Sequence, residues 1–123
     1  MGHVRYSTSG GTLIRNIQPL FAEFMFGGLA VAHNGNLTNA YQLRRALVER
    51  GNIFQSTSDT EVIIHLMAIS EAGHVIDRLI DALRQIDGAY SLVAMTQKKL
   101  IGVRDPAGVR PLVLGKLGDA HIL

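Results

Sequence analysis

The sequence predicts a single domain of the α+β class, and three observations support this prediction. The chain has 123 residues, close to the usual size of one domain, and 47% of them are hydrophobic, which is enough for a packed core. Helical periodicity is confined to the middle of the chain, whereas short strand-like segments separated by turns follow residue 88. Helices followed by a run of closely spaced strands are typical of α+β domains with antiparallel sheets.

The first part of the chain predicts two short strands and one helix. Residues 2–6 (GHVRY) and 28–32 (GLAVA) have the composition of strands. A helix is expected from Thr38 or Asn39 to about residue 50, where Gly51 would end it. Between the second strand and this helix, Asn34-Gly35 predicts a tight turn, because both residue types tolerate positive φ.

The second part predicts two more helices and a β-meander. Ser58 and Glu61 have the spacing of a capping box, so a helix is expected from there to about Ser70. Apolar residues at helical spacing predict another helix over about residues 74–86. Four strands should then follow, over 89–95, 100–104, 109–115 and 120–123, with a type I turn at Asp105-Pro106-Ala107-Gly108.

Composition excludes several classes of function. The net charge of +2 comes from scattered residues, so no basic patch for nucleic acid is expected. No apolar run is long enough to span a membrane and no signal peptide is recognisable, which predicts a cytoplasmic protein. The absence of cysteine and the wide spacing of the five histidines argue against a metal site.

Three polar clusters interrupt the apolar first half of the chain, at residues 3–8 (HVRYST), 33–36 (HNGN) and 57–61 (TSDTE). Each lies where a predicted strand or helix begins or ends, which is where a rigid scaffold usually presents functional groups. Each also has a purely structural interpretation: a solvated Arg5, a helix-start carboxylate at Asp59, and a structural His33 with its hydrogen bonds satisfied. The residue types alone leave both interpretations open.

Five motifs occur in a fixed order along the chain: GHVRYSTSGG, Gln18-Pro19, AHNGNLTN, TSDTE and RDPAGVRPL. Together they resemble the glutaminase domain of the amidophosphoribosyltransferases, which are class II glutamine amidotransferases, and the resemblance covers residues 2–123. It implies a partial N-terminal-nucleophile hydrolase fold, an αββα sandwich of antiparallel sheets flanked by helices. Enzymes of this family hydrolyse glutamine and transfer the ammonia to phosphoribosyl pyrophosphate, giving 5-phosphoribosylamine in the first step of purine synthesis.

The resemblance also implies how glutamine would be bound. Arg5 matches the arginine that grips the α-carboxylate, a task suited to a planar guanidinium that donates two parallel hydrogen bonds. Asp59 matches the carboxylate that receives the α-ammonium group. Tyr6 and Thr8 lie beside Arg5 in the motif and are expected to line the same pocket.

Asn34 and Gly35 match the oxyanion hole of the family. The asparagine would donate from its side-chain amide and the glycine from its backbone N–H, both towards the oxygen that becomes negative in the tetrahedral intermediate. On this interpretation the predicted turn would place two donors where charge develops, and glycine would let the backbone approach the substrate.

The nucleophile of the family has no counterpart in this sequence. The family uses the thiol of an N-terminal cysteine, whereas this chain has no cysteine and begins with Met1-Gly2. We therefore expect a fragment of a glutaminase domain that is inactive alone; an intact but degenerate small protein is the second interpretation. Uncovered sheet edges should lead either to self-association into a homo-oligomer or to marginal stability. No cofactor is expected in the fragment; magnesium, phosphoribosyl pyrophosphate and, in some members, an iron–sulfur cluster would belong to missing regions.

Other interpretations remain open at this point. The glutaminase domains of asparagine synthetase and glucosamine-6-phosphate synthase share parts of the pattern, although Tyr6-Ser7-Thr8 favours amidophosphoribosyltransferase. A non-catalytic module that binds glutamine without hydrolysing it, or an assembly piece completed by a partner, would also fit the sequence.

Overall fold

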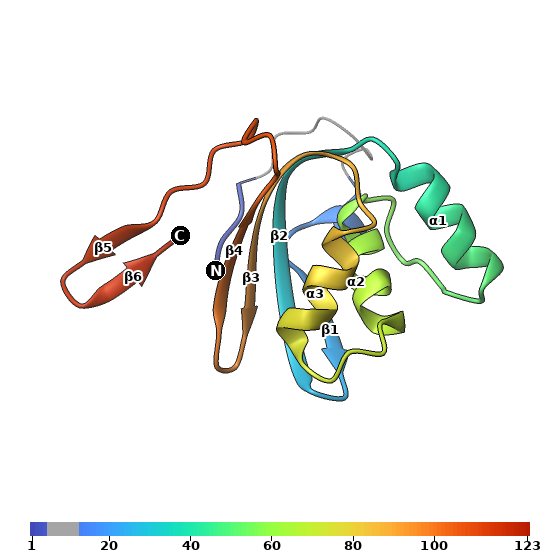
Figure 1. Ribbon diagram of the computed structural model, residues 1–123, viewed down its shortest axis with the longest axis horizontal. Helices are drawn as coiled ribbons and strands as arrows, with labels where there is room; N and C mark the ends of the chain where they lie inside the picture. Colours follow the sequence, from blue (N-terminus) through green and yellow to red (C-terminus); the bar gives the residue numbers. More distant parts are fainter. Residues whose placement is uncertain (5–12) are drawn as a thin grey trace.

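The computed structural model describes residues 1–4 and 13–123, so Arg5, Tyr6 and Thr8 lie outside the described residues. The elements follow one another as in Figure 1: η1 (Ile14–Asn16), β1 (Leu20–Phe24), β2 (Gly27–Leu37), α1 (Ala40–Glu49), α2 (Thr60–Ile69), α3 (Val75–Leu83), β3 (Gly88–Thr96), β4 (Leu100–Arg104), β5 (Gly115–Leu117) and β6 (Ala120–Ile122). This order confirms the predicted α+β class.

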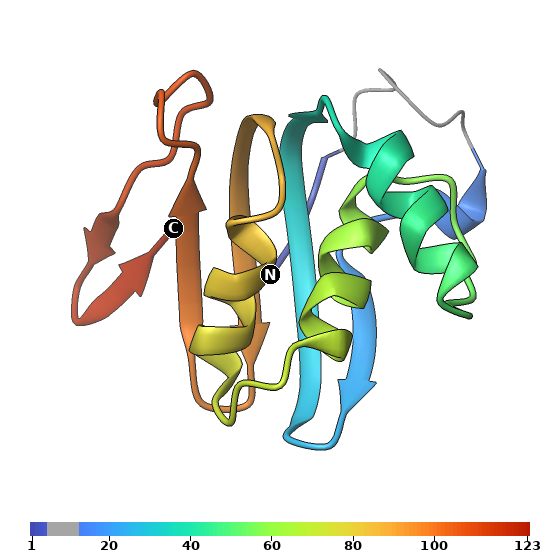
Figure 2. The same ribbon diagram turned by 45° about the vertical axis from the view of Figure 1, so that its right-hand side comes forward.

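The described residues form layers around one antiparallel sheet with the order β1-β2-β3-β4. The helices α1, α2 and α3 lie on one face of this sheet, and the β5–β6 hairpin lies on the other side (Figures 1 and 2). Contact between the hairpin end and the sheet is close, because a Cβ added to Gly102 of β4 would lie 3.0 Å from the Leu123 side chain. Helices, a sheet and two strands beyond it are the layers of a partial αββα sandwich.

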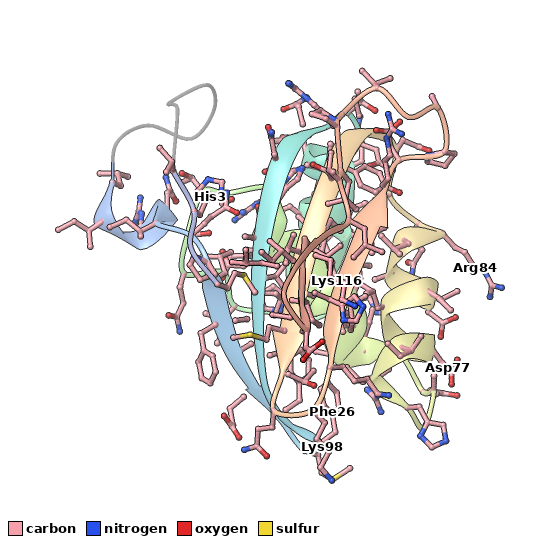
Figure 3. The ribbon with its side chains drawn as sticks, turned by 90° about the vertical axis from the view of Figure 1, so that its left-hand side faces the viewer. His3, Phe26, Asp77, Arg84, Lys98 and Lys116 are labelled. Atoms are coloured by element: carbon pink, nitrogen blue, oxygen red, sulfur yellow. The ribbon has the colours of Figure 1, made fainter. Side chains whose placement is uncertain are left out.

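The core lies between the sheet and α2. Leu29 and Val31 of β2 are fully buried against Val62 and Ile63 of α2, and each such side chain contributes about 1.5–3 kcal/mol by leaving water. Helix α3 is amphipathic and completes the layer: Leu79 and Ala82 are buried, whereas Asp77 and Arg84 project away from the sheet (Figure 3). The packing therefore fixes α2 directly over β2, the strand that carries the HNGN motif.

Two glycines allow β2 and β3 to approach each other closely. Gly35, with φ +146°, pairs with Tyr90, and Gly88, with φ +143°, pairs with Leu37. A Cβ on Gly35 would collide with the carbonyl oxygen of Ala89, and one on Gly88 would collide with that of Asn36. The β2–β3 ladder can therefore continue to Leu37 only because both positions lack a side chain.

The predicted turn at Asn34-Gly35 is wrong, because β2 extends without interruption from Gly27 to Leu37. Asn-Gly favours a turn when only the local sequence is considered. Here residues 29–37 of β2 pair with the neighbouring strand β3, and this pairing keeps Asn34 and Gly35 extended. The predicted strand over residues 2–6 is also not seen in its described part, since residues 2–4 have no strand structure. Strand β1 was not predicted; it pairs with β2 from Leu20↔Val31 to Phe24↔Gly27.

The predicted helices over about residues 38–50, 58–70 and 74–86 are confirmed with shorter bounds. Helix α1 ends as expected: Gly51 adopts φ +90° and the Asn52 amide donates to the carbonyl of Leu47. The predicted strands over 89–95 and 100–104 are confirmed as β3 and β4, and the last one as β6. Of the strand expected over 109–115, only Gly115 is part of a strand, as the first residue of β5.

Side chains of the RDPAG motif explain why no strand begins at residue 109. The turn is confirmed by a 2.9 Å hydrogen bond from the Gly108 amide to the carbonyl of Asp105. The Asp105 carboxylate then accepts from the amides of Val109 (3.0 Å) and Arg110 (3.1 Å), which are groups that a strand would use for pairing. The Arg104 guanidinium donates to the carbonyls of Gly108 and Arg110, so hydrogen bonds within the motif hold residues 108–110 next to the end of β4.

Asn39 joins the beginning of α1 to the beginning of β3. Its side-chain amide donates to the carbonyl of Gln85 (2.9 Å) and the carboxylate of Asp87 (3.1 Å), and its Oδ1 accepts from the Asp87 amide (3.0 Å). The Thr38 amide also donates to the Asp87 carbonyl at 2.8 Å. Two chain segments 48 residues apart are thereby tied together at the end of the β2–β3 ladder.

The capping box predicted for Ser58 and Glu61 is wrong. Helix α2 begins at Thr60, and the Glu61 carboxylate reaches back to the Gln55 amide (2.8 Å), the Ser56 amide (2.8 Å) and the Ser56 hydroxyl (2.6 Å). Arg44 of α1 supports the same segment from the other side, donating to the carbonyls of Ser56 and Ser58. The approach to Asp59 is therefore held by both neighbouring helices.

Replacing Gly88 by alanine tests the glycine requirement of the ladder. The new Cβ would meet the backbone of Asn36, so we expect the free energy of unfolding to fall by roughly 2–4 kcal/mol, measured by urea denaturation. Gly73→Ala is the control, because Gly73 has open space around it and its change should stay within about 0.5 kcal/mol. Equal stability of the two variants would contradict the proposed close approach.

Glu61→Gln tests the anchoring of the segment before α2. Glutamine keeps one acceptor but presents an amide group to backbone donors, so the free energy of unfolding should fall by about 1–3 kcal/mol. Glu49→Gln is the matched control: Glu49 is 64% exposed and pairs with Arg45 at the surface, and its loss should cost less than about 0.5 kcal/mol. Denaturant titration of both variants measures this difference. A loss in Glu61→Gln as small as that in Glu49→Gln would mean that Glu61 does not anchor the segment before α2.

The contribution of Glu61 to the stability of the fold should also depend on pH, and it should be lost as the pH falls. Burial raises the pKa of Glu61, but hydrogen bonds from Gln55 and Ser56 outweigh it and hold this pKa below 4.5. A depressed folded-state pKa means stability that is complete above the unfolded pKa and lost as the pH falls through the folded one. The contribution of Glu61 to the free energy of unfolding should thus be complete above about pH 5.5 and be lost below pH 4.5, so the decline in this acidic range should be less steep in Glu61→Gln than in the wild type.

Candidate active site

Asp59 meets the C-terminal half of β2. It precedes the first residue of α2, and its Oδ2 accepts a hydrogen bond from the Leu37 amide at 3.0 Å. Its Oδ1 lies 3.5 Å from Nδ1 of His33. One strand therefore contacts both carboxylate oxygens, from positions on either side of Asn34-Gly35.

His33 is almost completely buried, with 4% of its surface exposed. Besides Asp59, its Nδ1 faces the hydroxyl of Thr60 at 3.1 Å, and its backbone amide donates to the side chain of Gln18 at 2.6 Å. Its Nε2 is buried and has no hydrogen-bond partner among the residues that the structure describes. The prediction of a structural histidine with satisfied hydrogen bonds is therefore correct for Nδ1 and wrong for Nε2.

The surroundings of Asp59 favour its charged form. Burial acts to raise the pKa of this carboxyl, but His33 and the backbone amides of Leu37 and Thr60 together hold the pKa below its usual 3.8. The side chain keeps 15% of its surface exposed and lines a cavity of about 320 Å³ together with Tyr41, Arg44 and Thr57. At neutral pH the site thus presents a fixed negative charge to a small opening.

Asn34 and Gly35 lie next to each other on β2, and consecutive strand residues point to opposite faces of a sheet. The Asn34 side chain is exposed and lines a second cavity of about 340 Å³, on the side of the β5–β6 hairpin. Ser91 and His3 line the same cavity, so the beginning of the GHVRYST motif lies near Asn34. Gly35 lies opposite Tyr90 in the ladder.

The described residues therefore bring Asp59, His33 and Leu37 together, and His33 also lines the cavity into which Asn34 opens. The predicted sites Arg5, Tyr6 and Thr8 lie outside the described residues. Sequence reasoning missed the Leu37 amide, because a backbone donor leaves no trace in residue type. It also missed the supporting contacts of Arg44, whose spacing from residues 56–58 shows no local motif.

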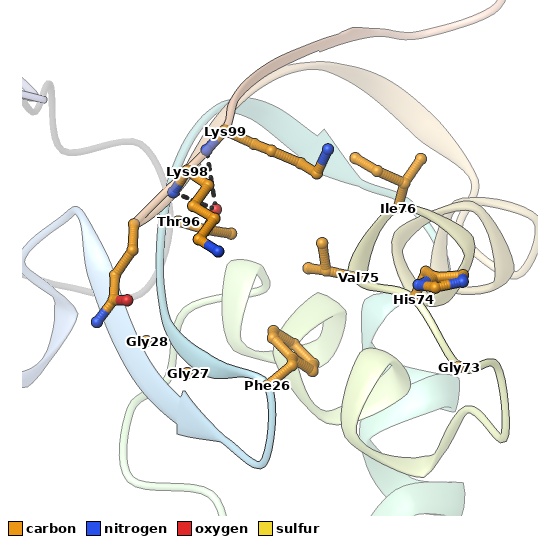
Figure 4. A pocket seen from close by; sticks show the side chains of 11 residues that line it. Phe26, Gly27, Gly28, Gly73, His74, Val75, Ile76, Thr96, Lys98 and Lys99 are labelled. Carbon is orange, nitrogen blue, oxygen red and sulfur yellow. Dashed lines mark hydrogen bonds between the residues drawn. The ribbon is translucent and has the colours of Figure 1, made fainter.

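A further cavity of about 470 Å³ lies at the other end of β2 (Figure 4). Phe26, Val75, Lys98 and Lys99 line it, and it is bounded by the β1–β2 and β3–β4 turns and the beginning of α3. Within residues 1–4 and 13–123, no group of three or more His, Asp or Glu side chains could hold a metal ion. None of the described helices is long and apolar enough to cross a membrane.

Comparisons with known proteins agree along the whole chain. Residues 3–123 match the family model described as a glutamine amidotransferase domain. The chain is 58% identical to amidophosphoribosyltransferase of Rhizobium etli over 99% of its length, and 47% identical to that of Bacillus subtilis over 100%. It is 50% identical to chloroplastic amidophosphoribosyltransferase 1 of Arabidopsis thaliana over 100% of its length. The chain spans 22–26% of the length of these three relatives.

Solved structures give the same result for the fold. Glutamine phosphoribosylpyrophosphate amidotransferase from B. subtilis, complexed with ADP and GMP, superposes with a TM-score of 0.89 and 44% identity. A structure described as the allosteric regulatory enzyme of purine biosynthesis gives 0.91 and 46%. Each match covers 97% of this chain and 26% of the other, and confirms the predicted N-terminal-nucleophile hydrolase fold. The chain belongs to the glutamine amidotransferase domain family, and its likeness is to that domain of the amidophosphoribosyltransferases.

Proposed function

We propose that this chain forms the glutamine-binding part of an amidophosphoribosyltransferase glutaminase domain. The observation that supports this role best is the charged Asp59 carboxylate, held by β2 at both of its oxygens and open to a small cavity. In the complete enzyme, glutamine would be hydrolysed to glutamate and ammonia, and the ammonia would convert phosphoribosyl pyrophosphate into 5-phosphoribosylamine.

Asp59 would receive the α-ammonium group of glutamine. A carboxylate whose oxygens are already oriented by backbone and side-chain donors loses little entropy when a cation binds. An ammonium–carboxylate hydrogen bond is also stronger than a neutral one, because both groups are charged. Arg5 would bind the α-carboxylate in the same way, and Tyr6 and Thr8 would line the pocket beside it.

Asn34 and Gly35 would stabilise the oxyanion that forms on the amide carbonyl. Donors are most effective when they are fixed before the reaction, because no reorganisation is then needed as charge develops. The continuous β2–β3 ladder supplies such rigidity around Gly35, where a turn would be more mobile. In the complete enzyme, the loss of one oxyanion donor typically costs about 100- to 1000-fold in rate.

In this family a cysteine thiol attacks glutamine, and the sequence of this chain contains no cysteine. The proposed role of the chain by itself is therefore binding. Magnesium, phosphoribosyl pyrophosphate and, in some enzymes, an iron–sulfur cluster would be bound by the remaining three quarters of the longer relatives, which would also contribute to a homo-oligomer.

Calorimetry with Asp59→Asn tests this proposal. The wild-type chain should bind glutamine, prefer it to asparagine, and prefer it to 4-carbamoylbutanoate, which is glutamine without its amino group. Asp59→Asn should weaken glutamine binding by roughly 10- to 100-fold, because a charged hydrogen bond is lost. Asp119→Asn removes the same charge from an exposed turn of the β5–β6 hairpin and should leave the affinity unchanged.

Two results would contradict the proposal. One is equal affinity of the wild type for glutamine and 4-carbamoylbutanoate, and the other is an unchanged affinity in Asp59→Asn. The same samples should release no ammonia from glutamine, because the acyl-transfer step has no thiol. Ammonia release by the chain alone would reveal a different nucleophile.

A further inference from the structure

His33 contacts Asp59, and the proposed oxyanion role of the neighbouring Asn34 and Gly35 does not account for this contact. We propose that His33 is a positioning residue: through its Nδ1 it orients the Asp59 carboxylate towards the α-ammonium group, and so sets the preference for ligands with a free α-amino group. This inference rests on the proposed binding role of Asp59. It assigns to β2 a second task besides carrying the oxyanion donors.

Two residues of β2 contact the Asp59 carboxylate, one at each oxygen. Leu37 donates to Oδ2 at 3.0 Å, and the backbone amide of Thr60 also faces the carboxylate. His33 approaches the other oxygen, Oδ1, with its Nδ1 at 3.5 Å. Since only 15% of the Asp59 side chain is exposed, the direction of the accessible lone pairs decides whether an ammonium group can be bound.

The surroundings of the imidazole indicate which nitrogen carries a proton. Within residues 1–4 and 13–123 Nε2 is buried without a partner, so an N–H there would be an unsatisfied donor in this part of the structure. It would also leave the lone pair of Nδ1 facing the negatively charged Oδ1. A proton on Nδ1 instead has two acceptors within reach, Asp59 Oδ1 and the hydroxyl oxygen of Thr60 at 3.1 Å. The geometry therefore favours Nδ1–H, the form that can orient the carboxylate.

The imidazole is itself held in place by its neighbours. Thr60 Oγ1 also lies 3.1 Å from the hydroxyl of Ser58, so a row of hydroxyls supports the ring on the side of α2. On the side of β2, the backbone amide of His33 donates to Gln18 Oε1 at 2.6 Å. With 4% of its surface exposed, the ring has little room to turn, which is the property a positioning residue needs.

His33→Asn and His33→Gln form a matched pair for the test. The shorter asparagine amide can place an N–H near the position of Nδ1, whereas glutamine places it near that of Nε2. Calorimetry on the full chain gives the ratio of the affinities for glutamine and 4-carbamoylbutanoate. We expect His33→Asn to keep this ratio within about 2-fold and His33→Gln to lower it by roughly 5- to 20-fold. A merely structural role would weaken both ligands equally and leave the ratio unchanged.

A second readout needs no ligand. Carbon-13 NMR follows the titration of the Asp59 carboxyl, which also faces the amides of Leu37 and Thr60 and shares its cavity with Arg44. The midpoint should rise in His33→Gln, because a donor to the charged form is lost, and stay near the wild-type value in His33→Asn. Thermal unfolding of each variant shows that the fold is kept.

The outcomes separate the inference from the proposed function. If the wild type fails to prefer glutamine to 4-carbamoylbutanoate, the role of Asp59 is wrong and the inference falls with it. If the wild type shows the preference and both His33 variants retain it, only the inference is overturned. Equal loss in both variants would overturn the assignment to Nδ1. In the Asp59→Asn background, His33→Gln should have no further effect on the ratio.

Discussion

The close approach of β2 and β3 is the constraint on which the rest of the structure depends. Side chains are excluded at Gly35 and Gly88, where each strand passes within contact of the other's backbone. Because the ladder continues to Leu37, the amide of that residue reaches the carboxylate of Asp59 at the beginning of α2. The site is thus assembled by a feature of the sheet, and the helices add support to a strand that is already in place.

Local patterns in the sequence identified those elements whose residues interact mainly with near neighbours. The three helices, the β3–β4 hairpin and the Asp105–Gly108 turn were all predicted, since periodicity and turn chemistry act over a few residues. The errors occur where distant partners decide. Asn34-Gly35 reads as a turn in isolation but is extended by pairing with residues 90 and 91, and β1 is a strand because β2 lies beside it. Glu61 was predicted to close a capping box with Ser58, but its carboxylate accepts hydrogen bonds from Gln55 and Ser56, which precede the helix.

The candidate site likewise combines features that local sequence can indicate with features that depend on distant parts of the chain. The motif resemblance predicts Asp59, Asn34 and Gly35 as site residues, because residue types and their order can be compared directly in the sequence. It could not show that Asn34 is exposed to a cavity that His33 also lines, since this depends on the register of β2 and on residues that lie beyond the sheet. Nor could it show the role of the Leu37 amide, which any residue other than proline would supply. The register and the backbone of β2 therefore contribute to this site in ways that the residue types in the motifs do not reveal.

The contact between Asn39 and Asp87 has a consequence for the order of events in folding. It closes a loop of 48 residues that contains all of α1, α2 and α3, whereas the β1–β2 and β3–β4 hairpins join neighbouring segments. The entropy lost on closing a loop grows with its length, although each doubling adds only about 0.6 kcal/mol. Hairpins and helices can therefore form early from local contacts, and the central ladder, with the site at its end, should be the late and rate-limiting step of folding.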